Sequence, residues 1–225
     1  MRINKRIVIL FVVTVIAVMG VIYLYLDDNQ LTSSTTTSSK TNDYDGKESE
    51  SGIKMGSETN SFNIQDIKLE RKEVLSNKVS ILIPDSFKKM SEELMKIKYP
   101  KENRPTLVYT NEDATVNIAF KVTENEIRPE QIQGFKEIIK NNLQEVYSTD
   151  GLVKDGVYEI NGKTIGMIEY KTPADDTEIY NYIFFTDLDN KLLLSTINFT
   201  TEKKEVWQPI AEEIMNSLEI YEEDI

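Results

Sequence analysis

The 225-residue sequence contains no cysteine and no histidine. Without cysteine there are no disulfide bonds, thiol nucleophiles, iron–sulfur clusters or lipid groups attached to a thiol. Without histidine there is no Ser-His-Asp or Cys-His catalytic machinery and no zinc site of the common kinds. The sequence therefore excludes most hydrolase classes and leaves chemistry based on carboxylates, hydroxyls and amines.

Basic residues are also few. The chain has 26 lysines and arginines against 38 aspartates and glutamates, which gives a formal net charge of -12. An acidic surface repels phosphate backbones and anionic lipid headgroups. We therefore expect no nucleic-acid partner and no general adhesion to a membrane surface, and no motif indicates a cofactor.

A long run without charge, IVILFVVTVIAVMGVIYLYL, covers residues 7–26. At about 1.5 Å per helical residue, it spans the roughly 30 Å hydrocarbon core of a bilayer. Three basic residues precede the run and two aspartates follow it, and positive charge favours the cytoplasmic side. We expect a transmembrane helix at residues 7–26, a cytoplasmic N-terminus at residues 1–6 and the rest of the chain outside.

A cleaved signal peptide is the alternative, because Val18 and Gly20 are small residues that suit a cleavage site. Cleavage there would leave the apolar run VIYLYL at the new terminus, and the apolar part of a signal peptide is normally only about 7–15 residues long. The sequence therefore favours an uncleaved anchor and a single-pass protein of the cell membrane.

Residues 27–61 contain few apolar side chains and include a Ser/Thr tract at residues 32–37. Such a composition buries too little apolar surface to offset the entropy of ordering. A flexible chain of this length reaches about 30 Å. We expect a disordered linker that holds a domain of residues 62–225 close to the outer leaflet.

Strand and helix patterns alternate through residues 62–225. Strand-like runs flank four turns, which lie at Ser76-Asn77, residues 111–113, Asn161-Gly162 and Asp189-Asn190. Apolar stripes with helical spacing predict three helices, formed by Phe87, Met90, Leu94 and Ile97; by Ile132, Phe135, Ile139, Leu143 and Val146; and by Val206, Ile210, Ile214 and Leu218. Pro209 is expected to kink the last helix or to mark its beginning. These patterns predict an α+β domain whose mostly antiparallel sheet is covered by about three amphipathic helices.

Three segments of this domain carry a family resemblance. They read ILIPDSF, KYPKENRPTLVYTNEDATVNIAF and EVWQPIAEEIMNSLEI. Together with the order of elements over about residues 62–221, they resemble the PsbP-like group, which includes the extrinsic subunit P of photosystem II, the yeast Ran-release factor and bacterial secreted relatives of the DcrB type. The resemblance implies an α/β/α sandwich that serves as a binding or assembly module, and it carries over no catalytic residue. The transmembrane run and the linker differ from the plant subunit and argue against a photosynthetic role.

The stretch KIKYPKENRP at residues 96–105 is basic within an acidic chain. Its two prolines indicate an extended corner that leads into a strand, and the lysines of its helical half are expected on the solvated side. A structural corner is the preferred interpretation. The alternative is a patch of Lys98, Lys101 and Arg104 at which an acidic partner docks.

Two acidic stretches contain the oxygen ligands that calcium prefers. In DLDNK at residues 187–191, Lys191 stands where a third ligand is needed, so a hairpin tip is the better interpretation. Asp175, Asp176 and Glu178 form a second acidic loop, which we interpret as solvated. A divalent-ion site at that loop is the alternative.

Together these observations predict a membrane-anchored extracytoplasmic binding or assembly module of a bacterial cell envelope. It would act through contacts with an unknown envelope protein, without catalysis, metal or cofactor. The alternative is a carboxylate-based enzyme or a small-ligand receptor that acts on cell-wall or sugar material. Convergent acids about 5–10 Å apart in a cleft would favour the enzyme, and a filled sheet would favour partner binding.

Overall fold

The computed structural model describes residues 67–99, 104–174 and 177–221. The expected transmembrane helix at residues 7–26 and the linker at residues 27–61 lie outside these residues. No helix within the described ranges is both long and apolar enough to cross a membrane.

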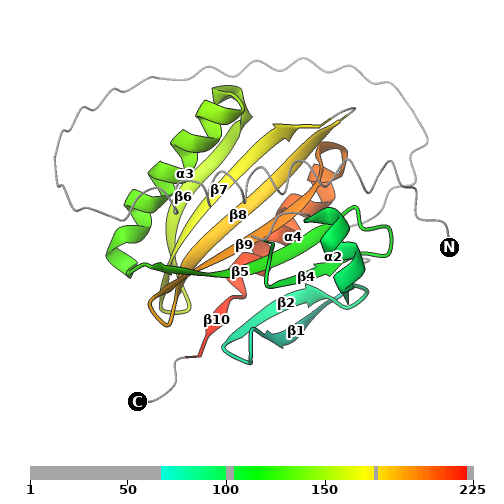
Figure 1. The fold of residues 1–225 in the computed structure, drawn as a ribbon, viewed down its shortest axis with the longest axis horizontal. Coiled ribbons are helices and arrows are strands. Elements are labelled where there is room, and N and C mark those ends of the chain that lie inside the picture. The colour runs from blue at the N-terminus through cyan, green and yellow to red at the C-terminus, as the bar shows by residue number, and fades with distance from the viewer. Residues whose placement is uncertain (1–66, 100–103, 175–176, 222–225) are drawn as a thin grey trace.

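Runs of strands are separated by three helices in the described part of the chain, and Figure 1 labels most of these elements. The strands are β1 Leu69–Val74, β2 Val79–Pro84, β3 Lys88–Lys89, β4 Leu107–Thr110, β5 Asn117–Glu126, β6 Leu152–Ile160, β7 Lys163–Pro173, β8 Glu178–Leu188, β9 Lys191–Thr200 and β10 Glu219–Ile220. The helices are α2 Glu92–Lys98, α3 Ile132–Val146 and α4 Lys204–Asn216. Short 3₁₀ turns precede α3, β6 and α4, and they are η2 Pro129–Gln131, η3 Thr149–Gly151 and η4 Thr201–Lys203.

The strands form two sheets. The large sheet has the order β3-β4-β5-β9-β8-β7-β6, and the small sheet has the order β1-β2-β10. Every strand pairing in the described part of the chain is antiparallel. The expected antiparallel architecture is confirmed, and the structure adds that the first hairpin and the last strand form a sheet of their own.

Left-handed turn residues set two hairpins of the large sheet. The φ angles are 49° at Asn161 and 79° at Gly162, and they are 53° at Asp189 and 61° at Asn190. Two successive residues at positive φ are typical of a type I′ turn, whose twist matches that of the flanking strands. Residues 187–191 are therefore a hairpin tip, as the sequence predicted.

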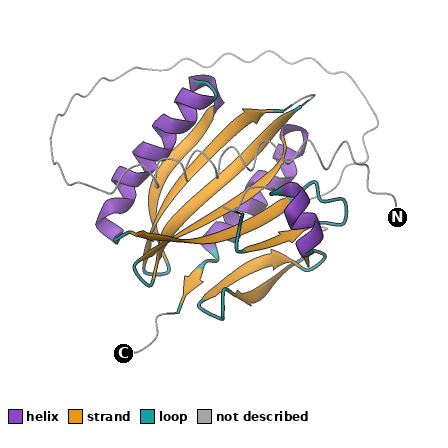
Figure 2. Cartoon of the chain, in the orientation of Figure 1, coloured by secondary structure: helices purple, strands orange, loops and turns teal. Residues whose placement is uncertain are grey.

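Helices cover both faces of the large sheet (Figure 2). On one face, α3 packs on β6 and β7, and Phe135 meets Phe185 edge to face with ring centroids 5.1 Å apart. On the other face, α4 packs on β8, β9 and β2, and Trp207 and Ile214 share a core with the small sheet. This arrangement is the α/β/α order that the resemblance implied, with the small sheet beside α4.

The first predicted helix was wrong in its extent. Helix α2 begins after Ser91, whose hydroxyl accepts a hydrogen bond from the backbone N–H of Leu94. Phe87 and Met90 precede the helix and lie in the cores on opposite faces of the large sheet, and Ile97 is 55% exposed. Phe87, Met90, Leu94 and Ile97 are spaced by three and four residues, as in a helical stripe. Phe87 and Met90 nevertheless flank the two-residue strand β3 and are not part of the helix.

Helix α4 is unbroken from Lys204 to Asn216 although it contains Pro209. Pro209 is exposed, so its ring lies on the solvent side of the helix. The prediction that Pro209 marks the beginning of the helix was therefore wrong.

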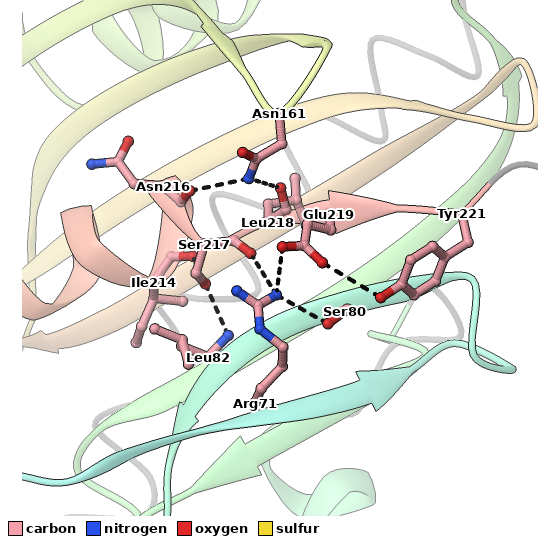
Figure 3. Close-up of polar contacts among 10 residues, drawn as sticks. All are labelled: Arg71, Ser80, Leu82, Asn161, Ile214, Asn216, Ser217, Leu218, Glu219 and Tyr221. Atoms are coloured by element: carbon pink, nitrogen blue, oxygen red, sulfur yellow. Dashed lines mark hydrogen bonds and ion pairs between the residues drawn. The ribbon is translucent and has the colours of Figure 1, made fainter.

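The C-terminal strand β10 is tied to the small sheet by Arg71 of β1 (Figure 3). The Arg71 guanidinium donates to the carbonyl oxygen of Ser217 at 3.1 Å and to the hydroxyl of Ser80 at 3.0 Å. It also lies 3.2 Å from a carboxylate oxygen of Glu219. One side chain thus connects β1, β2, the end of α4 and β10.

Two further contacts fix the same segment (Figure 3). The backbone N–H of Leu82 donates to the Ser217 hydroxyl at 2.9 Å. The Asn161 amide, from the β6–β7 turn, donates to the carbonyl oxygens of Asn216 at 3.3 Å and Leu218 at 2.8 Å. We call the contacts of Arg71, Ser217 and Asn161 the C-terminal latch, because they join the end of the described chain to both sheets.

Candidate functional site

The basic stretch at residues 96–105 matches the expected patch only in part. Lys98 is 2% exposed, and its ammonium donates to the carbonyl oxygen of Ala114 in the β4–β5 loop. Burial lowers the pKa of Lys98 to about 8. The prediction that Lys98 lies on the solvated side was wrong, because α2 turns Lys98 inward and leaves Ile97 outside.

Arg104 is partly buried just before β4, and Lys101 lies outside the described residues. Pro105 is buried, and the backbone N–H of Thr106 bonds to the carbonyl oxygen of Phe120 at 2.8 Å. This geometry agrees with a structural corner that leads into β4. Docking of an acidic partner there stays a prediction, but the buried Lys98 would not supply an exposed charge for it.

The second acidic loop is described only at its end. Asp175 and Asp176 lie outside the described residues, and Glu178 is exposed at the start of β8. In the described ranges, no group of three or more acidic side chains is placed to hold a metal ion. The divalent-ion alternative at this loop stays a prediction.

A polar cluster lies between α4 and the β6–β7–β8 end of the large sheet, where the sequence indicated only strand packing. We call it the α4–β6 cluster and define it as Lys154, Tyr158, Glu169, Tyr180, Gln208 and Glu212. Strand register brings three of its members together, since Lys154 lies opposite Glu169 and Tyr180 lies on the strand that pairs with β7. Its sequence signal is the acid within the otherwise apolar run GMIEY of β7.

The inner half of the cluster is centred on Glu169, which is 1% exposed. Its two carboxylate oxygens accept from the Tyr180 hydroxyl and, at 3.4 Å, from the Gln208 amide. The Tyr180 ring stacks on Phe199 with centroids 5.3 Å apart, and the Lys204 ammonium lies 5.4 Å from the Tyr180 ring centroid. Burial and then the bond to Glu169 raise the pKa of Tyr180, so its hydroxyl stays protonated and acts as a donor.

The outer half of the cluster reaches the surface. The Lys154 ammonium lies 3.6 Å from a carboxylate oxygen of Glu212, and both side chains are 44% exposed. The same ammonium lies 6.0 Å from the centroid of the Tyr158 ring. A Cβ at Gly156 would come within 2.7 Å of the Tyr158 hydroxyl, so the ring rests on a strand position that only glycine can occupy without displacing it.

The pKa of Lys154 links the two halves. Partial burial lowers this pKa, but the charges of Glu212 and Glu169 and the nearby Tyr158 outweigh burial and raise it above its ordinary value. Two carboxylates therefore act on one lysine. Glu169 is already occupied by Tyr180 and Gln208, so the arrangement fixes these side chains in place.

An ionic group on the opposite face holds β6 to α3. The ammonium of Lys136 bonds to Asp155 of β6 and lies 3.0 Å from Glu137, and Lys140 lies 3.5 Å from Asp155. Burial raises the pKa of Asp155, but the bonds and charges of Lys136 and Lys140 outweigh burial and lower it below its ordinary value. Lys154 and Asp155 of β6 are thus bound to the helices on the two faces.

Comparison with solved structures shows the fold. No protein-family model matches the sequence, and no curated protein matches it. The solution structure of CyanoP, the PsbP protein of the cyanobacterium Synechocystis, is similar over 74% of this chain and 98% of that chain, with 13% identity and a TM-score of 0.50. This similarity confirms the PsbP-like fold.

Two other solved structures are similar at lower scores. LpqN of Mycobacterium tuberculosis, described as involved in cell envelope biogenesis, matches 71% of this chain and 95% of that chain, with 11% identity and a TM-score of 0.44. The Ran-binding protein Mog1p of Saccharomyces cerevisiae matches 69% of this chain and 96% of that chain, with 11% identity and a TM-score of 0.41.

Proposed function

We propose that this protein is a membrane-anchored extracytoplasmic binding or assembly module of a bacterial cell envelope, and that it acts through protein contacts without catalysis. The observation that carries the proposal is the division of the α4–β6 cluster. Its buried carboxylate and phenol are occupied by each other, and its outer half presents a lysine, a glutamate and an aromatic ring in fixed positions. Mixed charge beside an aromatic ring, held by a rigid framework, is suited to recognition of another protein.

The membrane placement rests on residues 7–26. Their length and lack of charge suit a bilayer-spanning helix, and the flanking charges favour an exterior domain. Protease added to intact cells is expected to cut within residues 27–61 and to release a folded fragment. A fragment that appears only after lysis would contradict the exterior placement.

The alternative function is a carboxylate-based enzyme or small-ligand receptor for cell-wall or sugar material. Glu169 and Glu212 are the observation in its favour, because both act on Lys154. Glycoside cleavage needs one carboxyl group that can give a proton and a second that can attack or activate water. In this alternative, Gln208 and Tyr180 would have to release Glu169 when substrate binds.

Crosslinking in intact cells tests the proposal. A photoreactive phenylalanine analogue replaces Tyr158, and the matched control replaces Tyr221, an exposed aromatic residue of the C-terminal segment. We expect the Tyr158 position to capture an envelope protein and the Tyr221 position to capture none. Exchange of the two charges in Lys154→Glu/Glu212→Lys is expected to weaken capture without unfolding the protein.

Two results would overturn the proposal. One is equal capture at both positions, which indicates random collision. The other is cleavage of wall material by the purified protein that Glu169→Gln abolishes, which would establish the enzyme.

A further inference from the structure

Strand β6 forms one end of the large sheet. In the described part of the chain it pairs with β7 on its inner side, and no strand lies on its outer side. Such an edge presents a row of backbone N–H and C=O groups that can pair with another chain. We propose that β6 is the interface at which two copies of this protein join, antiparallel, into one continuous sheet. The proposal does not depend on the function proposed above.

The hairpin turn decides which backbone groups point outward. Ile160 and Lys163 flank the two-residue turn, so they form a hydrogen-bonded pair. Bonded and non-bonded pairs alternate along antiparallel strands. Every second residue from Ile160 back to Lys154 therefore directs its backbone N–H and C=O groups toward β7. The residues between them, Asp155, Val157 and Glu159, direct these groups outward.

The usual means of guarding an edge are used little here. Proteins block edges with proline, outward lysine, bulges or very short strands. Strand β6 contains no proline. Lys154 and Asp155 are bound to α4 and α3, on the two faces of the sheet, and Glu159 accepts from Thr164 of β7. A bulge between Leu152 and Lys154 guards the start of the strand and leaves the segment beyond it able to pair.

The other sheet ends differ from β6. Strand β3, at the far end of the large sheet, and strand β10, at one end of the small sheet, have only two residues each. Strand β1, at the other end of the small sheet, carries a continuous row of charges in Glu70, Arg71, Lys72 and Glu73. The nine-residue β6 is thus the sheet end best suited to pairing in the described part of the chain.

Charge fixes the register and favours a second copy as the occupant. When Gly156 faces Gly156 of the second copy, Lys154 faces Tyr158 and no like charges meet. A shift of two residues in one direction places Asp155 opposite Asp155, and a shift in the other direction places Asp155 opposite Glu159. Like charges directly opposite each other destabilise strand pairs. The strand is therefore self-complementary in the Gly156-centred register.

This register also joins the two α4–β6 clusters. Each Lys154 meets the Tyr158 ring of the second copy, repeating a contact that these residues make within one chain at 6.0 Å. The pairing is a two-fold symmetric interface, so each copy supplies both halves of it. Because the chain has a net charge of -12, the two copies repel each other at long range, and added salt should strengthen their association.

Disulfide crosslinking of the full chain in membranes tests the register. Residues 154 and 158 of opposite copies would form a non-hydrogen-bonded pair with Cα atoms about 4.5 Å apart, a separation that a disulfide can span. The natural chain has no cysteine, so Lys154→Cys and Tyr158→Cys each carry a single thiol. We expect a disulfide-linked dimer when the two variants are co-expressed, and monomers when each is expressed alone.

A proline at position 159 tests the backbone pairing. Glu159→Pro removes an outward N–H and is expected to abolish the crosslink, whereas Glu159→Gln, which keeps the N–H, is expected to retain it. Resistance to protease confirms that each variant is folded, and the cysteine pairing decides alone if the proline variant does not fold. Absence of dimer in the co-expressed pair, or equal dimer in either variant alone, would overturn the proposal.

Discussion

The two sheets end in opposite ways. At the small sheet, the chain supplies its own last strand, and β10 pairs with β2 through only Glu219 and Ile220. Two residues of pairing are too few to hold a strand by backbone bonds alone. The C-terminal latch and the burial of Leu218 supply the rest. The edge of β2 is thus covered by β10, which side chains hold in place, and we call it the closed edge.

At the β6 end of the large sheet, the side chains do something else. Asp155 is bound to α3 and Lys154 to α4, so both are drawn to the faces of the sheet. The backbone between them is left to define the edge. The ionic contacts of Arg71 run across the small sheet and hold its last strand in place. Those of Lys154 and Asp155 run to the helices on the two faces of the large sheet and leave the backbone edge of β6 exposed.

The largest expected effect is at the closed edge. Leu218 is 1% exposed and lies in the core between α4 and β10, so Leu218→Ala should lower the free energy of unfolding by about 3 kcal/mol. Amide exchange should accelerate in β10 more than in β8. Val146→Ala is the matched control, because Val146 is 54% exposed and its truncation should cost less than about 0.5 kcal/mol. If urea denaturation shows the same loss in free energy of unfolding for Leu218→Ala as for Val146→Ala, β10 is held by its backbone alone.

The next effect concerns the latch. Arg71→Ala removes donors to Ser217 and Ser80 and the contact with Glu219, so it should cost about 1–2 kcal/mol. Arg71→Lys keeps the charge but loses the planar fork, and it should recover less than half of this loss. Full recovery by lysine would mean that charge alone holds the edge.

The sequence predicted what depends on near neighbours. The turns at Asn161-Gly162 and Asp189-Asn190 and the apolar stripe of α3 as far as Leu143 are local patterns, and the structure confirms them, whereas Val146 at the end of the predicted stripe is exposed. The latch could not be predicted, because Arg71 and Ser217 are 146 positions apart and meet only when both sheets are assembled.

The surroundings of the candidate side chains could not be predicted for a similar reason. Lys98 and Ile97 exchange their expected places because the start of α2 is set by Ser91 and not by the apolar spacing. Glu169 was not predicted as a site residue, because its partners Tyr180 and Gln208 come from β8 and α4. Only the register of the sheet and the placement of α4 bring these groups together.

A smaller effect is expected at the β6 end, and it depends on pH. The folded-state pKa of Asp155 is below its ordinary value of 3.8, so its contribution to stability is present above that pH and is lost as the pH falls through the folded-state value. Asp155→Asn should cost about 1 kcal/mol at neutral pH. The difference between the variant and the natural chain should shrink in denaturation experiments below about pH 4.

A double-mutant cycle with Lys136→Met identifies the source of that effect. If Lys136 stabilises the Asp155 carboxylate, the sum of the losses in free energy of unfolding in the two single variants should exceed the loss in the double variant. Strict additivity would show that Asp155 acts without Lys136 and that β6 is not held to α3 by this pair.

The smallest effect is expected where the two sheets touch through exposed charges. The Lys78 ammonium, in the β1–β2 turn, lies 2.6 Å from a carboxylate oxygen of Asp189 in the β8–β9 turn. Asp189→Asn removes the charge and keeps a residue type that tolerates the φ of 53°. Because exposed pairs contribute little and are screened by salt, the loss should be below about 0.5 kcal/mol at low salt and vanish at high salt. The contrasting variant, Asp187→Asn on the same hairpin, breaks a more buried contact with Lys163 at 3.0 Å and should cost more at both salt concentrations. If Asp189→Asn costs as much as Asp187→Asn, and if salt leaves its loss unchanged, the exposed pair helps to join the two sheets and the closed edge extends beyond the latch.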